Sequence, residues 1–176
     1  MASQGPPVLR GERVLLRPLV ERDVGALAAI LAEPSVARWW GEWDAERVRA
    51  ELLAQDEEDT VLAVEADGEL AGLVQWYEEP DPQYRHAALD ISLGAAYQDQ
   101  GLGREALRLA VAHLIEARGH HRLTIDPAAH NERAIRAYAA VGFKPVGVLR
   151  RYERAAGGDW HDGLLMDLLA DEFAAL

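Results

Sequence analysis

Two glycines and several polar side chains stand together at positions 98–104 of this 176-residue chain, in the order Gln-Asp-Gln-Gly-Leu-Gly-Arg. The segment follows an apolar stretch and precedes a run with the periodicity of a long helix. Glycines at a helix start let the backbone approach a ligand, and the free N–H groups of the first turn point toward it. Such a loop suits a pyrophosphate, and Arg104 could add a cation. A tight turn without any ligand is the alternative interpretation.

The spacing of these residues excludes two familiar phosphate motifs. A P-loop requires Gly-Lys followed by Ser or Thr, whereas Gly103 is followed here by Arg104 and Glu105. The dinucleotide-binding fingerprint requires a third glycine and an opening β-α-β unit, and the sequence has neither. The glycine pair alone therefore leaves the ligand loop and the plain turn equally open.

The elements that must position this loop follow from the periodicity of apolar residues. Strands are predicted at 13–18, 60–64, 70–77, 87–93, 122–126, 145–154 and 160–168, and helices at 21–32, 44–55, 101–118 and 131–141. Asp44 and Asn131 are predicted N-caps, Asp67-Gly68 predicts a hairpin turn, and Gly142 a left-handed helix end. This order predicts an α+β fold with one mixed, mostly antiparallel sheet and helices on both faces. We expect a flexible leader at 1–10 and a single domain at 11–176.

Composition narrows the class of partner and of chemistry. The net charge of −12 disfavours nucleic acid and membrane surfaces and favours cationic ligands. The absence of cysteine excludes disulfides, thiolate zinc sites and cysteine nucleophiles. The six histidines lack metal-site spacing, so we expect no metal. The sequence also lacks the features of a signal peptide and any apolar run of 18 residues, which predicts a cytoplasmic protein.

A second pattern strengthens the ligand interpretation of the glycine loop. Gln98-x-x-Gly101-x-Gly103 resembles the acyl-coenzyme A motif of the Gcn5-related N-acetyltransferase (GNAT) superfamily, and the segment 131–143 resembles its second signature. The two lie at the expected separation, and the order of elements is similar over nearly the whole chain. The resemblance implies a sheet splayed between its fourth and fifth strands, with acetyl-CoA as co-substrate in the opening.

The same resemblance implies roles for individual residues. Asn131 would contact the pantetheine arm, and Tyr138 would protonate the departing thiolate; a core aromatic is the alternative for Tyr138. The implied pyrophosphate loop consists of Gln98, Gln100, Gly101, Gly103 and Arg104.

Transfer from a thioester requires a neutral amine as the nucleophile. An alkylammonium group has a pKa near 10, so about one molecule in a thousand is neutral at pH 7. A carboxylate that removes the proton, directly or through water, overcomes this deficit. Asp90 and Asp126 are the candidates, because each lies in or at the end of a predicted interior strand among apolar residues. The alternatives are a strand-edge residue for Asp90 and a turn former before Pro127 for Asp126.

A narrower resemblance concerns the acceptor. Trp39-Trp40-Gly41, Gln75-x-Tyr77, Leu89-Asp90 and the segment 124–131 resemble aminoglycoside 6′-N-acetyltransferases, in which the matching aspartates engage the aminoglycoside and its reacting amine. The acceptor-site residues that this implies are Trp40, Gln75, Tyr77, Asp90 and Asp126. Trp39, Trp40 and Trp43 either pack a short helix or form a flat wall for sugar rings. The tail at 157–166 is instead similar to ribosomal-protein N-terminal acetyltransferases.

The sequence therefore predicts an acetyl-CoA-dependent N-acetyltransferase acting on a small cationic amine, first of all the 6′-amine of an aminoglycoside, which would confer antibiotic resistance. Direct attack without an acyl-enzyme is expected, because cysteine and a Gly-x-Ser-x-Gly elbow are both missing. One alternative is a ribosomal-protein N-terminal or polyamine acetyltransferase, and another is a non-enzymatic module that binds acyl-CoA or a cation. The oligomeric state, monomer or homodimer, is left open.

Overall fold

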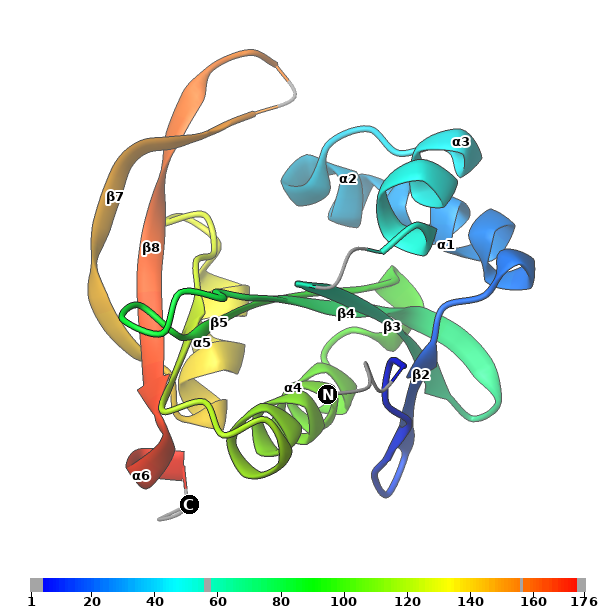
Figure 1. Ribbon diagram of the computed structural model, residues 1–176. Helices are drawn as coiled ribbons and strands as arrows, with labels where there is room; N and C mark the ends of the chain where they lie inside the picture. Colours follow the sequence, from blue (N-terminus) through cyan, green and yellow to red (C-terminus); the bar gives the residue numbers. More distant parts are fainter. Residues whose placement is uncertain (1–4, 56–57, 156, 174–176) are drawn as a thin grey trace.

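A single eight-stranded sheet in the order β1-β2-β3-β4-β5-β6-β8-β7 forms the centre of the computed structural model, which describes residues 5–55, 58–155 and 157–173 (Figure 1). The strands are β1 Leu9–Arg10, β2 Val14–Pro18, β3 Asp59–Ala66, β4 Glu69–Glu78, β5 Ala87–Leu93, β6 Arg122–Ile125, β7 Lys144–Arg154 and β8 Trp160–Leu169. Neighbouring strands are antiparallel except β5 and β6, which are parallel. The predicted mixed, mostly antiparallel sheet is thus confirmed.

Helices cover both faces of this sheet, as predicted (Figure 1). The N-terminal group is η1 Glu21–Asp23, α1 Val24–Leu31, α2 Pro34–Trp40, α3 Ala45–Arg47 and η2 Val48–Leu53. The remaining helices are η3 Ala95–Tyr97, α4 Leu102–Ala112, η4 His113–Ala117, α5 Glu132–Val141 and α6 Ala170–Phe173. Each group buries its apolar side in a separate cluster, one containing Leu27 and Leu73, the other Leu107 and Val74. Within the described ranges, no helix is long and apolar enough to cross a bilayer.

Local signals in the sequence set the ends of several elements. The Asp44 carboxylate accepts a hydrogen bond from the Arg47 N–H (2.8 Å), and the Asn131 side-chain oxygen accepts one from the Ala134 N–H (3.2 Å), so both predicted N-caps are confirmed. Asp67 and Gly68 both have positive φ, 53° and 81°, which matches the twist of a tight hairpin. These caps and turns fix where the strands and helices that border the site begin.

Two segments differ from the prediction. No helix was predicted between residues 32 and 44, yet α2 begins there at Pro34, where the missing N–H of proline costs nothing. Leu9 and Arg10 lie in the predicted leader, yet they pair with Leu16 and Leu15 of β2. The ordered structure therefore includes β1, while residues 1–4 of the leader lie outside the described residues.

The sheet opens between β5 and β6. These strands pair only at Ala87↔Leu123 and Ala88↔Thr124, close to the start of both. They diverge toward Asp90 and Asp126, each two residues beyond the last pair. The predicted splay between the fourth and fifth strands of the sequence analysis is confirmed at this seam, since β1 was not among the strands counted there.

Candidate active site

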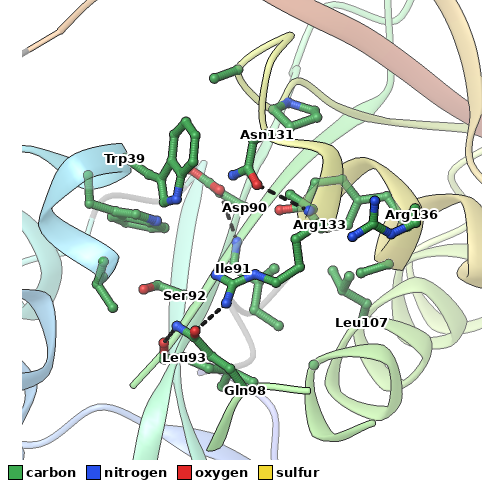
Figure 2. A pocket seen from close by; sticks show the side chains of 18 of the residues that line it. Trp39, Asp90, Ile91, Ser92, Leu93, Gln98, Leu107, Asn131, Arg133 and Arg136 are labelled. Carbon is green, nitrogen blue, oxygen red and sulfur yellow. Dashed lines mark hydrogen bonds between the residues drawn. The ribbon is translucent and has the colours of Figure 1, made fainter. Parts of the chain in front are cut away.

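A cavity of about 830 Å³ occupies the opening between β5 and the end of β6 (Figure 2). Its walls come from α2, α4, α5 and the far end of β7, so segments distant in the sequence meet around it. The sequence-predicted residues that line it are Trp40, Gln75, Asp90, Gln98, Gly101, Gly103, Arg104, Asp126, Asn131 and Tyr138. The structure therefore brings together both aspartates, most of the glycine loop and the tyrosine.

Gln100 and Tyr77 do not line this cavity. The Gln100 side-chain amide donates to the Ala96 carbonyl (2.5 Å), and the residue borders a shallower pocket on the outer side of the loop. Tyr77 pairs with Ala88, where β5 and β6 are still joined, whereas Gln75 pairs with Asp90 beyond the divergence. Gln75 therefore lies at the opening of the sheet, whereas Tyr77, two residues further along β4, lies where β5 and β6 are still paired.

The glycine loop presents unpaired backbone donors to the cavity. The first hydrogen bond of α4 runs from the Glu105 N–H to the Gly101 carbonyl (3.1 Å), so the N–H groups of the preceding turn have no partner within the helix. Gly101 has φ 80°, and a Cβ on Gly103 would lie 3.3 Å from Leu93 Cδ1. A chain that turns this tightly at a helix start fits the diphosphate of acetyl-CoA.

Two arginines that the sequence analysis did not single out extend this anion-binding side. Arg133 and Arg136 of α5 line the cavity together with Arg104 of α4. Arg133 donates a hydrogen bond to the Gln98 side-chain oxygen, and Gln98 donates to the Leu93 carbonyl (2.7 Å) (Figure 2). The sequence contained a signal for these two residues, because Arg133 and Arg136 are three positions apart in the helix that also carries Tyr138, and this spacing places both on one helix face.

Asp90 is an acid of β5 whose side chain is exposed to the cavity that it lines. Its carboxylate accepts a hydrogen bond from the Ile91 N–H (3.0 Å) (Figure 2). Surrounding protein raises the pKa of Asp90 to about 7, and the negative charges of Asp126 and Glu153 add to this shift. The residue is solvent-accessible, so the shift comes from the protein walls that reduce the hydration of the carboxylate within the cavity and not from complete burial. A carboxyl group with this pKa can exchange protons near neutrality.

Asp126 has a different environment because a phenol is bound to it. The Tyr152 hydroxyl donates to Asp126 Oδ2 (2.5 Å), and this hydrogen bond, together with burial, raises the pKa of Tyr152 to about 12. Glu153 adds a third carboxylate to Asp90 and Asp126, while Asp99 of the glycine loop also lines the cavity. The sequence analysis missed Tyr152 and Glu153, because strand periodicity predicts that adjacent residues point to opposite faces.

Tyr138 lies in α5 with its ring buried in the larger apolar cluster and its side chain lining the cavity. The end of the helix is fixed one turn later, since the N–H groups of Gly142 and Phe143 donate to the Tyr138 carbonyl (3.2 and 3.1 Å). Burial raises the pKa of Tyr138 well above its ordinary value, with smaller effects from Asp90 and Asp126. The phenol is therefore protonated throughout the physiological range.

The three tryptophans both pack and line the cavity. Trp40 and Trp43 contact the N-terminal apolar cluster, and the Trp43 indole N–H donates to the Trp40 carbonyl (2.8 Å). Trp39 contacts His130, with 5.1 Å between ring centroids. All three indoles also border the opening. The two interpretations offered by the sequence are thus compatible.

A substitution at Gly101 tests the loop as an anion site. A residue with a side chain pays about 1–2 kcal/mol for this left-handed conformation. Alanine should therefore shift the free loop away from the conformation that CoA requires, and we expect Gly101→Ala to weaken CoA binding by roughly tenfold. Calorimetric titration with CoA measures this. Gly147→Ala is the control, because Gly147 lies in open space without a left-handed φ. Equal affinity in both variants and the wild type would contradict this role for the loop.

A mixed sheet opened between two parallel strands, with a glycine-containing helix start beside the opening, has the architecture of an acetyltransferase. The Acetyltransferase (GNAT) domain family matches residues 13–144. Spermidine N(1)-acetyltransferase of Escherichia coli (strain K12) is 29% identical over 167 residues, covering 92% of this chain and 89% of that protein. Aminoglycoside N(6′)-acetyltransferase type 1 of Klebsiella pneumoniae is 30% identical over 158 residues, covering 78% and 77%.

A solved structure gives the same result in three dimensions. Mycobacterium smegmatis RimJ in complex with CoA-disulfide superimposes with a TM-score of 0.84 at 25% identity, covering 96% of this chain and 90% of that one. The chain belongs to the GNAT family and is an N-acetyltransferase. The GNAT fold binds acetyl-CoA, and the glycine loop and three arginines described above fit that co-substrate.

Proposed function

We propose that this enzyme transfers the acetyl group of acetyl-CoA to a primary amine of a polycationic aminosugar, first of all the 6′-amine of an aminoglycoside. The observation that carries the proposal is that three carboxylates outside the glycine loop and three tryptophan side chains line one cavity. The carboxylates are those of Asp90, Asp126 and Glu153, and the indoles of Trp39, Trp40 and Trp43 form what we call the indole wall. Carboxylates attract ammonium groups, and flat aromatic faces pack against the apolar faces of sugar rings. The similarity to an aminoglycoside N(6′)-acetyltransferase supports the same acceptor.

Asp90 and Tyr138 divide the proton transfers between them. Asp90, ionised above about pH 7, takes the proton from the reacting ammonium directly or through water, which leaves a neutral amine to attack the thioester carbonyl. Tyr138 donates its hydroxyl proton to the sulfur as the carbon–sulfur bond breaks, and the phenolate regains a proton when the newly acetylated nitrogen loses its second one. The products are then the neutral amide and the free thiol of CoA, and Asp90 releases its proton to solvent. Asp126 and Glu153 hold the other ammonium groups.

A linear polyamine is the second candidate acceptor. The similarity to spermidine N(1)-acetyltransferase covers more of the chain than the similarity to the aminoglycoside enzyme, 92% against 78%. The same three carboxylates could hold a flexible polycation. The indole wall favours the aminosugar, because a polyamine has no ring faces to pack against it.

An acceptor screen tests the function. Purified enzyme is mixed with acetyl-CoA and either kanamycin-type aminoglycosides, spermidine, or peptides with free N-termini, and thiol release is followed with mass spectrometry of the product. We expect the aminoglycosides to react with the highest kcat/KM, with one acetyl group on the 6′-amine. Turnover of spermidine alone selects the second candidate. Turnover of peptides alone rejects both.

The pH profile tests Asp90 as the base. Only the ionised carboxylate accepts a proton, so we expect kcat/KM for the acceptor to rise with pH and to level off above about pH 7. Glu153→Gln removes one of the charges that raise the pKa of Asp90, so the midpoint should move to lower pH in this variant. A rising limb that stays at the same pH in Glu153→Gln, or is missing from the wild type, would contradict the assignment.

A further inference from the structure

Two adjacent residues of β7 point into the same cavity. Tyr152 and Glu153 both line it, although successive side chains of a regular strand alternate between the two faces of a sheet. Both residues act on the acceptor side, Tyr152 as a donor to Asp126 and Glu153 as a third carboxylate. A departure from regular strand geometry must therefore lie close to them.

That departure is a bulge between Leu149 and Glu153. Leu149 pairs with Gly163 and Glu153 pairs with His161, so three residues of β7 lie opposite one residue of β8. Within the bulge Arg151 has φ 49°, a left-handed conformation that is uncommon for a residue with a side chain. A bulge of this kind re-aims the side chains that follow it.

Asp162 is the single residue of β8 opposite the bulge, and it stabilises the bulge with its side chain. Its Oδ1 accepts a hydrogen bond from the Arg151 N–H (2.7 Å), which takes the place of a ladder bond. Its backbone carbonyl accepts another from the Ala129 N–H (2.8 Å), in the segment that follows Asp126. One residue thus ties the bulge to the loop that carries the aspartate.

The next residue of β8 fits the same arrangement. A Cβ on Gly163 would lie 2.9 Å from Cδ1 of Tyr152, so the tyrosine ring lies directly over the glycine backbone. The Tyr152 hydroxyl then reaches Asp126 Oδ2. The Tyr152 ring therefore packs on the bare backbone of Gly163, while the residue remains 51% exposed.

We propose that Asp162 is a positioning residue for the acceptor site: it holds the Arg151 bulge that brings the Tyr152 hydroxyl to Asp126 and so orients that carboxylate toward the acceptor. This inference rests on the proposed function for the identity of the acceptor, but the hydrogen-bond chain is independent of it. Asp162 itself acts through Arg151 and Tyr152 and does not contact the reacting amine.

A double-mutant cycle tests the chain. We expect Asp162→Ala and Tyr152→Phe each to raise KM for the acceptor about tenfold, while kcat and KM for acetyl-CoA change less than twofold. The double variant should be no worse than the poorer single variant, because both changes break one chain. Asp162→Asn keeps an oxygen acceptor for the Arg151 N–H, so it should restore KM to within about twofold. Additive effects, or an Asn variant as poor as Ala, would overturn the proposal.

A spectroscopic measurement makes the test independent of activity. Tyr152 in the wild type titrates at about 12 because of Asp126, so its phenol remains protonated at pH 10.5. In folded Asp162→Ala, NMR of ¹³C-labelled tyrosine should show the Tyr152 pKa falling toward the ordinary value, with Tyr152→Phe identifying the signal. An unchanged titration would refute the positioning role, even if the acceptor screen has selected another amine. Absence of transfer by the wild type to every amine would count against the proposed function alone.

Discussion

Asp90→Asn should lower kcat/KM for the amine acceptor by at least about 100-fold, the usual loss when a general base is removed. Asparagine keeps the shape of the side chain but cannot take a proton at any pH, so the rising limb of the pH profile should disappear as well. CoA binding should persist, because the glycine loop and the arginines of α4 and α5 are unchanged. Steady-state kinetics with the selected acceptor and calorimetry with CoA measure the two effects.

The same substitution should stabilise the folded protein, with a dependence on pH that identifies the cause. The pKa of Asp90 is higher in the folded protein than in the unfolded chain, so the folded state binds the proton more tightly. Its contribution to stability is therefore complete below about pH 4, where the carboxyl group of the unfolded chain titrates, and is lost progressively until about pH 7, where the folded protein titrates. The melting temperature of Asp90→Asn should exceed that of the wild type by more at pH 8.5 than at pH 6. An Asp90→Asn variant with full activity would exclude Asp90 as the base. An equal difference in melting temperature at both pH values would show that the charge of Asp90 does not destabilise the folded protein.

Tyr138→Phe has the second large expected effect, a decrease of about 100-fold in kcat with little change in either KM. The phenylalanine ring fills the same space in the buried cluster, so the variant loses only the hydroxyl that faces the cavity. Without that donor, negative charge develops on the departing sulfur with no hydrogen bond to stabilise it.

The control for this prediction is the thermal unfolding of the same variant. An unchanged melting temperature with a large loss in kcat assigns the hydroxyl to the reaction. A kcat within twofold of the wild type would instead make Tyr138 a core aromatic, the alternative that its place on an amphipathic helix also allows.

Short-range signals predicted most of the fold because they act through neighbouring residues. Asp44 and Asn131 cap helices by bonding an N–H three residues away, and Asp67-Gly68 makes a turn by its own backbone preference. Helix α2, Pro34–Trp40, was missed because Pro34 can end one helix or begin another, and the packing of Trp40 against the N-terminal apolar cluster is a tertiary contact that local sequence does not reveal.

The site was predicted where a motif carried it and missed where tertiary contacts created it. Gln98 and Asp90 belong to local patterns, and the structure brings both to the cavity. Tyr152 and Glu153 reach the cavity only because the carboxylate of Asp162, on another strand, holds a left-handed residue between them and Leu149. No period of the sequence indicates a bulge of this kind, since the hydrogen bond that maintains it joins positions eleven residues apart.

The two residue pairs at the seam between β5 and β6 have a mechanical consequence. In the described part of the chain, these two pairs are the direct strand contact between β1–β5 and β6–β8, and the larger apolar cluster supplies the rest of the connection. A ligand that contacts both α4 and α5 would add a further connection between these two parts of the sheet. We therefore expect acetyl-CoA, even without an amine acceptor, to reduce local opening at this seam, so that the amide hydrogens of β5 and β6 exchange with solvent more slowly in its presence.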